Sequence, residues 1–196
     1  RAVWEVMGSG FTILDETSEF VPLPKVVSNE MCREPEDIVL DPVVKKQMRQ
    51  YVAVIASMYR VNPFHGFEHA THVTMSVSKL LSRIVSPENP VHCGQEVDHR
   101  LSLDDRTYGI TSDKLQQFAV VFSALIHDVD HRGVPNVVLA KEDEKLATLY
   151  KGKAIAEQNS VDLGWKVLMR SEFDQLRACI YTTPLELRRF RQLVVN

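Results

Sequence analysis

Hydrophobic residues recur with a helical period in the first half of the chain. Asp41-Pro42 is a typical helix start, and apolar residues follow it every three or four positions until Asn62-Pro63. The apolar positions are Val44, Met48, Tyr51, Val52, Ile55, Met58 and Tyr59. A second periodic stretch runs from Val73 to Val85 and is closed by Pro87. The pattern predicts two amphipathic helices.

The second half of the chain predicts further helices. Asp113 and Gln116 form a plausible capping pair before residues 115–126, which are apolar on nearly every side from Phe118 onward, so this helix should be central and buried. Helices are also predicted over 153–170 and 171–181. Thr183 and Glu186 match a capping box, with a proline at the first helical position, and start a last helix.

These elements predict an all-α fold. Residues 1–40, broken by prolines, are predicted to be an irregular lead-in, residues 87–112 a long polar loop, and residues 41–196 the body of one domain. With 196 residues, of which 44% are hydrophobic, the chain can bury a substantial core. No apolar run reaches the ~18–20 residues of a membrane span. The chain begins at Arg1 and stops in an apolar stretch at Asn196, so we expect both ends to be cuts through a longer protein with other domains.

Charge and cysteine usage exclude several classes of function. The formal net charge is -3, so no basic excess points to nucleic acid, and an anionic substrate would need local positive charge such as a metal ion. Cys32, Cys93 and Cys179 form no CxxC pair, which argues against a disulfide framework and a cysteine-based zinc site. A reducing compartment, the cytoplasm, is predicted. Membrane attachment of a longer parent protein stays open.

Five of the seven histidines fall in two short segments, residues 62–72 and 127–131. His65 and His69 are four residues apart, and so are His127 and His131, so each pair would share a helix face if the helix extends that far. Asp128 follows the most apolar helix, where an ionised carboxylate is costly unless it is paired or metal-bound. Imidazole and carboxylate ligands suit zinc, manganese or iron. A lone histidine is more often a core residue, but two such clusters together predict a metal site.

The two segments resemble the signature of class I 3′,5′-cyclic-nucleotide phosphodiesterases, members of the HD superfamily. Phe64-His65 and His69-Ala70 match the first motif, and residues 127–136 match His-Asp-x-Asp-His-x-Gly-x-x-Asn at every fixed position. Residues 146–150, Glu157 and residues 164–168 are similar to the family's next block. The resemblance covers roughly residues 40–196, and residues 156–161 are more similar to versions from single-celled eukaryotes.

The resemblance implies a multi-helix bundle that hydrolyses cyclic AMP, cyclic GMP or both to 5′-monophosphates in signal transduction. It implies two divalent ions, zinc and magnesium (or manganese). His69, His127 and Asp128 would ligate the first ion, Asp128 would also bridge to the second, and His65 would be the general acid. His131 and Glu157 would hydrogen-bond to water around the metals, Asp130 and Asn136 would support the site, and Phe64 would line the substrate pocket.

The chain departs from the family pattern at two places. The first is His72, which stands where the family usually has an aspartate. The second is that the fourth metal ligand and the nucleobase pocket would lie beyond Asn196. The bundle is therefore expected to be incomplete, and the isolated chain to bind metal poorly. Glu172 and Asp174 are better explained as a solvated helix start. Two alternatives stay open: another HD-type phosphohydrolase, or a degenerate module that binds without turnover.

Overall fold

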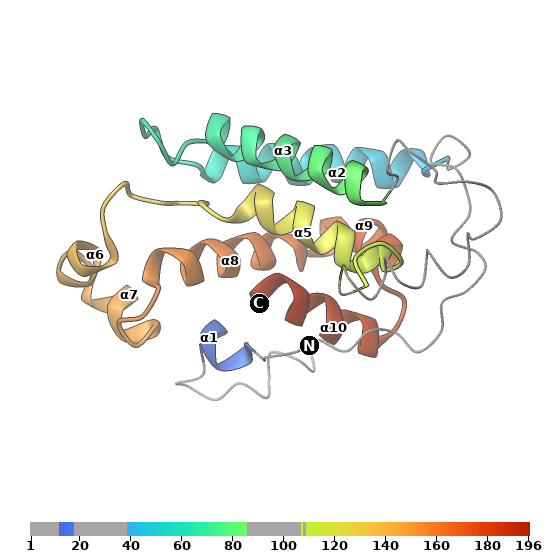
Figure 1. The fold of residues 1–196 in the computed structure, drawn as a ribbon. Helices are drawn as coiled ribbons and strands as arrows, with labels where there is room; N and C mark the ends of the chain where they lie inside the picture. The colour runs from blue at the N-terminus through green and yellow to red at the C-terminus, as the bar shows by residue number, and fades with distance from the viewer. Residues whose placement is uncertain (1–11, 18–38, 86–106, 108) are drawn as a thin grey trace.

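The computed structural model describes residues 12–17, 39–85, 107 and 109–196, and within these ranges every regular element is a helix (Figure 1). The all-α prediction is confirmed for this part of the chain. The helices are α1 (Ile13–Glu16), α2 (Pro42–Met58), α3 (Phe67–Val85), α5 (Lys114–Ile126), α6 (Asn136–Glu142), α7 (Glu144–Leu149), α8 (Ile155–Leu168), the 3₁₀ helix η3 (Ser171–Phe173), α9 (Asp174–Ile180) and α10 (Pro184–Val195).

Three helices begin at the caps that the sequence predicts. The Asp41 carboxylate accepts a hydrogen bond from the backbone N–H of Val43, with a proline at the start of α2. The Asp113 carboxylate accepts from two backbone N–H groups in the first turn of α5. Thr183 and Glu186 form the reciprocal capping box of α10. Each cap satisfies backbone donors that have no partner inside the helix.

Other boundaries differ from the predictions. The prediction that residues 1–40 are irregular is wrong at Ile13–Glu16, where Thr12 and Asp15 cap the short helix α1. Helix α3 begins at Phe67, before the apolar periodicity starts, because the polar residues of the first histidine segment form its opening turns. The short helices α6 and α7 were not predicted. Most of the predicted loop at 87–112, with His92 and His99, lies outside the described residues.

Helix α5 is central, as its sequence predicts. It packs against α3, α8 and α10, while α2 packs against α8 and α9 (Figure 1). The Phe122 ring of α5 lies 5.7 Å from the Tyr51 ring and 5.4 Å from the Phe190 ring, between centroids. Tyr51 is buried, and its hydroxyl donates to the backbone oxygen of Gly164 at 3.0 Å. One aromatic core therefore joins α2, α5, α8 and α10.

Helix α1 is fastened to the last helix of the chain. The guanidinium group of Arg191, a buried residue, donates two hydrogen bonds of 2.7 Å to the Glu16 carboxylate and lies 4.9 Å from the centre of the Trp165 ring. The backbone N–H of Leu14 donates to the Gln158 side chain on α8 at 3.3 Å. The beginning of the described chain is thus held by residues from its far end.

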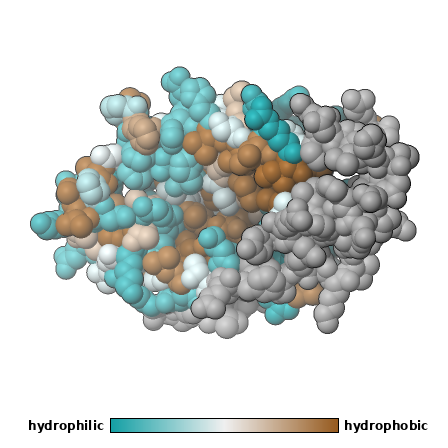
Figure 2. Space-filling model, viewed as in Figure 1, coloured by the Kyte–Doolittle hydropathy of each residue, from teal (hydrophilic) through white to brown (hydrophobic). Residues whose placement is uncertain are grey.

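An apolar cavity of about 320 Å³ lies between α2, α3, α5 and α9. The hydroxyls of Thr71 and Thr74, which line it, donate to backbone oxygens of α3 and so present no free donor to the cavity. In Figure 2, hydrophobic residues gather over α3 and α5. No helix in the described ranges combines the length and the apolar character needed to cross a membrane.

The crossing of α5 and α8 gives a stability prediction. A Cβ atom added at Gly164 would lie 2.9 Å from three side-chain atoms of Ile126, so the substitution Gly164→Val should overpack the core. We expect it to lower the free energy of unfolding by about 1–3 kcal/mol. Denaturant titration would measure the loss. The control, Lys166→Val, places the same side chain at an exposed position of α8 and should cost under about 0.5 kcal/mol; equal losses would contradict close packing at Gly164.

Candidate metal centre

Two residues of the centre lie where α5 ends. Helix α5 stops at Ile126, His127 caps it, and residues 127–130 form a turn that places Asp128 beside it. Helix α8 holds this turn in place, because Val129 is fully buried and its backbone oxygen accepts a hydrogen bond of 2.7 Å from the Ser160 hydroxyl of α8. The end of the most apolar helix is thus a fixed support for polar side chains.

The connection between α2 and α3 supplies the other half. His65 precedes α3, and its backbone N–H donates to the Asn62 side-chain oxygen at 3.0 Å. His69 lies in the first turn of α3. The next residue, Ala70, is fully buried and its N–H donates to the Gly66 oxygen at 3.2 Å, so this first turn is packed tightly against the body of the protein.

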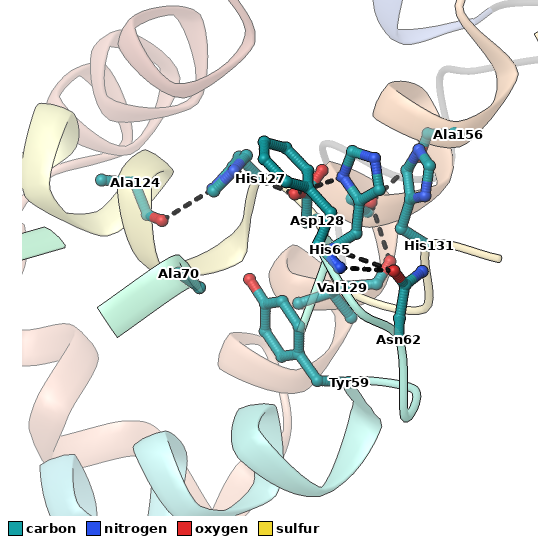
Figure 3. Close-up of polar contacts among 12 residues, drawn as sticks. Tyr59, Asn62, His65, Ala70, Ala124, His127, Asp128, Val129, His131 and Ala156 are labelled. Atoms are coloured by element: carbon teal, nitrogen blue, oxygen red, sulfur yellow. Dashed lines mark hydrogen bonds and ion pairs between the residues drawn. The ribbon is translucent and has the colours of Figure 1, made fainter. Parts of the chain in front are cut away.

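The two segments converge on Asp128. Ligand atoms of His69, His127 and Asp128 all lie within 4.8 Å of one another, and so do those of His65, Asp128 and His131. One carboxylate oxygen of Asp128 lies 2.8 Å from His65 Nδ1 and 3.1 Å from His127 Nε2 (Figure 3). Asp128 belongs to both groups, so the arrangement offers two sets of imidazole and carboxylate ligands that share one carboxylate, a donor set that suits divalent metal ions.

The electrostatics keep this carboxylate charged. Burial raises the pKa of Asp128, but hydrogen bonds from His127 and His65 outweigh it and bring the pKa to about 2. The pKa of His127 is raised, chiefly by its hydrogen bond to Asp128. Burial, followed by the neighbouring charge of His65, lowers the pKa of His131. His127 Nδ1 contacts the Ala124 backbone oxygen at 2.9 Å, which favours the tautomer that leaves Nε2 as a ligand atom.

The helix does not extend far enough for either histidine pair to share a helix face. His65 lies before α3 begins, His127 lies in the turn after α5 ends, and His131 directly follows that turn. The histidines meet because α3 packs against α5. The His65 ring stacks on the His131 ring with 3.7 Å between their centroids.

The remaining predicted residues, Glu157, Asn136 and Asp130, belong to neither group of ligand atoms. Glu157 is exposed and accepts a hydrogen bond of 2.9 Å from the Asn136 side-chain amide, whose oxygen accepts from the Ala156 N–H at 2.9 Å. Asp130, with a φ of 62°, instead pairs with Arg60 at 2.6 Å. Both arrangements brace the segments that carry the histidines.

Phe64 and His72 both lie at the surface. Phe64 is 63% exposed, and its ring lies 4.7 Å from the His69 ring and 5.0 Å from the His65 ring, between centroids. His72 is exposed and belongs to neither group of ligand atoms found among the described residues. Glu172 and Asp174 are exposed at the start of η3 and α9, as predicted.

Sequence reasoning missed two residues that support the cluster. Asn62 was interpreted only as the end of a helix, although its side chain holds the backbone before α3. The Tyr59 hydroxyl donates to the Leu125 backbone oxygen at 2.8 Å, which ties the end of α2 to the end of α5. An asparagine before a proline signals a turn, but nothing local indicates which distant segment the turn will contact.

The family model described as 3′5′-cyclic nucleotide phosphodiesterase matches residues 64–196, about two thirds of the chain. The chain belongs to this phosphodiesterase family. The match begins at the residue before His65 and includes every histidine and aspartate of the cluster. The incomplete bundle agrees with a partial phosphodiesterase domain.

The names of the relatives of this phosphodiesterase chain mention cyclic AMP or cyclic GMP. It is 27% identical over 146 residues to the probable 3′,5′-cyclic-AMP phosphodiesterase pde-4 of Caenorhabditis elegans, covering 74% of this chain and 18% of that protein. It is 26% identical over 198 residues to the cGMP-inhibited 3′,5′-cyclic phosphodiesterase 3A of Homo sapiens, covering 88% and 17%. The chain therefore spans about a fifth of the length of these relatives.

A solved structure shares the fold of the phosphodiesterase chain. The phosphodiesterase domain of the RhoPDE fusion protein from the choanoflagellate Salpingoeca rosetta superposes with a TM-score of 0.55 at 19% identity. The superposition covers 78% of this chain and 42% of that domain structure. The helices described above thus correspond to somewhat less than half of that structure.

The cluster predicts which histidine of α3 matters for metal binding. In the full-length protein, His69→Ala should weaken the binding of a divalent metal ion by at least about tenfold, because the substitution removes one of three clustered ligand atoms. The matched control is His72→Ala, a substitution three residues along the same helix at an exposed side chain. Metal content after dialysis, measured by elemental analysis, distinguishes the two; equal loss from both variants would rule out His69 as a ligand.

Proposed function

We propose that this chain is the N-terminal portion, residues 41–196, of a catalytic domain that hydrolyses 3′,5′-cyclic nucleotides to 5′-monophosphates. The observation that supports it most is the convergence of four histidines on one buried carboxylate, Asp128, within a family match. Relatives named for cyclic AMP and for cyclic GMP both align with the chain, so the proposal covers either nucleotide.

The donor set fits the metals that the resemblance implies. His69, His127 and Asp128 would hold a zinc ion, because two imidazoles and a carboxylate are common zinc ligands. Asp128 would share its carboxylate with a second ion, magnesium or manganese. When bound, the two ions would neutralise charge on the phosphate and make a water molecule nucleophilic near neutral pH.

His65 would serve as the general acid. Its Nδ1 faces the Asp128 carboxylate at 2.8 Å, which leaves Nε2 free to carry the proton toward the ribose 3′ oxygen as the P–O bond breaks. A histidine suits this role because its ordinary pKa lies close to the working pH. The His131 ring, stacked on His65, restricts the rotation of the acid.

The neighbouring residues would orient substrate and water. The Glu157 carboxylate, held by Asn136, would accept a hydrogen bond from a water molecule at the centre, and His131 would bind a second. Asp130 and Asn136 would brace the site without binding metal. Phe64, which lies against the rings of His65 and His69, would form an apolar wall of the substrate pocket. We place the domain in the cytoplasm, joined to further domains of a longer protein.

Substitution of the proposed acid tests the reaction. In the full-length protein, His65→Ala should lower kcat for cyclic AMP or cyclic GMP by about 10²–10⁴-fold, because the leaving oxygen loses its proton donor. Its zinc content should stay close to that of the unmodified protein, since His69, His127 and Asp128 remain. His72→Ala serves as the control and should keep full activity.

The same assay separates the alternatives. Hydrolysis of a nucleoside triphosphate in preference to both cyclic nucleotides would indicate another HD-type phosphohydrolase. Undetectable turnover of all three substrates by the metal-loaded full-length protein would contradict the proposed reaction and favour a module that binds without catalysis.

A further inference from the structure

We infer that Asn62 is a positioning residue that fixes the proposed acid, His65, against the turn that carries Asp128 and His131. The inference rests on the proposed function for its catalytic consequence, while its structural content stands on contacts alone. The hydrogen bonds of the Asn62 side chain go to backbone N–H groups, including that of His65, so Asn62 would act through His65.

The first contact is with the backbone before α3. The Asn62 side-chain oxygen accepts hydrogen bonds from the N–H groups of Phe64 and His65, both at 3.0 Å (Figure 3). These two residues precede α3, which begins at Phe67, so their N–H groups have no acceptor inside the helix. The Asn62 side chain therefore determines the path of the backbone on which His65 is mounted.

The second contact is with the segment after α5. Gly133 has a φ of 76°, and a Cβ atom there would lie 2.6 Å from Asn62 Nδ2 and 3.3 Å from its Cγ. The amide group of Asn62 thus occupies the space that any other side chain at Gly133 would need. The N–H of Gly133 donates to His131 Nδ1 at 3.0 Å, so the residue beside Asn62 also orients His131.

These contacts form a closed series that begins and ends at the proposed acid, His65. The Asn62 amide contacts the His65 backbone and also Gly133. Gly133 in turn orients His131, whose ring stacks on the His65 ring with 3.7 Å between centroids. His65 Nδ1 then reaches Asp128 at 2.8 Å. Loss of the Asn62 side chain would remove the hydrogen bond that holds the His65 backbone, while His69, His127 and Asp128 would stay in place.

Kinetics of two variants of the full-length protein test the catalytic consequence. Asn62→Ala removes the acceptor and should lower kcat for cyclic nucleotide by about 10- to 100-fold, with KM within about twofold and zinc content unchanged, because a misplaced acid slows the chemical step alone. Asn62→Asp keeps an oxygen in the same place and should retain kcat within about threefold. Unchanged kcat in Asn62→Ala, or a parallel loss of kcat and zinc in that variant, would overturn the inference.

Hydrogen exchange tests the structural content without relying on turnover. In the full-length protein, the N–H groups of Phe64 and His65 should exchange faster in Asn62→Ala by about tenfold, while Asn62→Asp and the rest of α3 keep their protection. This pattern in a protein that lacks turnover would sink the proposed reaction but support Asn62 as the anchor. Unchanged exchange in Asn62→Ala would refute the anchor even if the enzyme is active.

Discussion

The buried charge of Asp128 is the constraint on which the rest of this structure depends. Asp128 follows the most apolar helix and its side chain is only 11% exposed, where an uncompensated carboxylate would cost on the order of several kcal/mol. Histidines from two segments provide the compensation, and their approach requires that α3 pack against α5. The packing of the core thus brings histidines next to the Asp128 carboxylate, and this carboxylate is a group that a divalent cation would bind.

The parts of the fold that sequence could predict are those decided locally. Asp41, Asp113 and Thr183 each bond to backbone groups two or three residues away, so their helix starts can be read from neighbouring letters. Helices α1 and α6 are different, because each is under two turns long and carries no periodic pattern. They are stable through contacts such as Leu139 in the core beside Ile155, which no local signal reveals.

At the site, too, the sequence indicated which residues take part but not how they are arranged in space. The motif indicated which histidines would gather around Asp128, but a spacing of four residues suggested shared helix faces where the structure has turns. The backbone of Asp130 turns its carboxylate toward Arg60 through a left-handed conformation. The meeting of Asn62 with Gly133 depends on how two distant connections pack, and a single sequence carries no record of that packing.

The ion pair between Glu16 and Arg191 has a consequence for the order in which the chain acquires its structure. Helix α1 precedes the other described helices in the sequence, yet its main partners are Arg191 of α10 and Gln158 of α8, which are synthesised much later. Helix α1 is too short to persist alone. We therefore expect it to become ordered only once α10, whose Phe190 lies in the aromatic core, is in place.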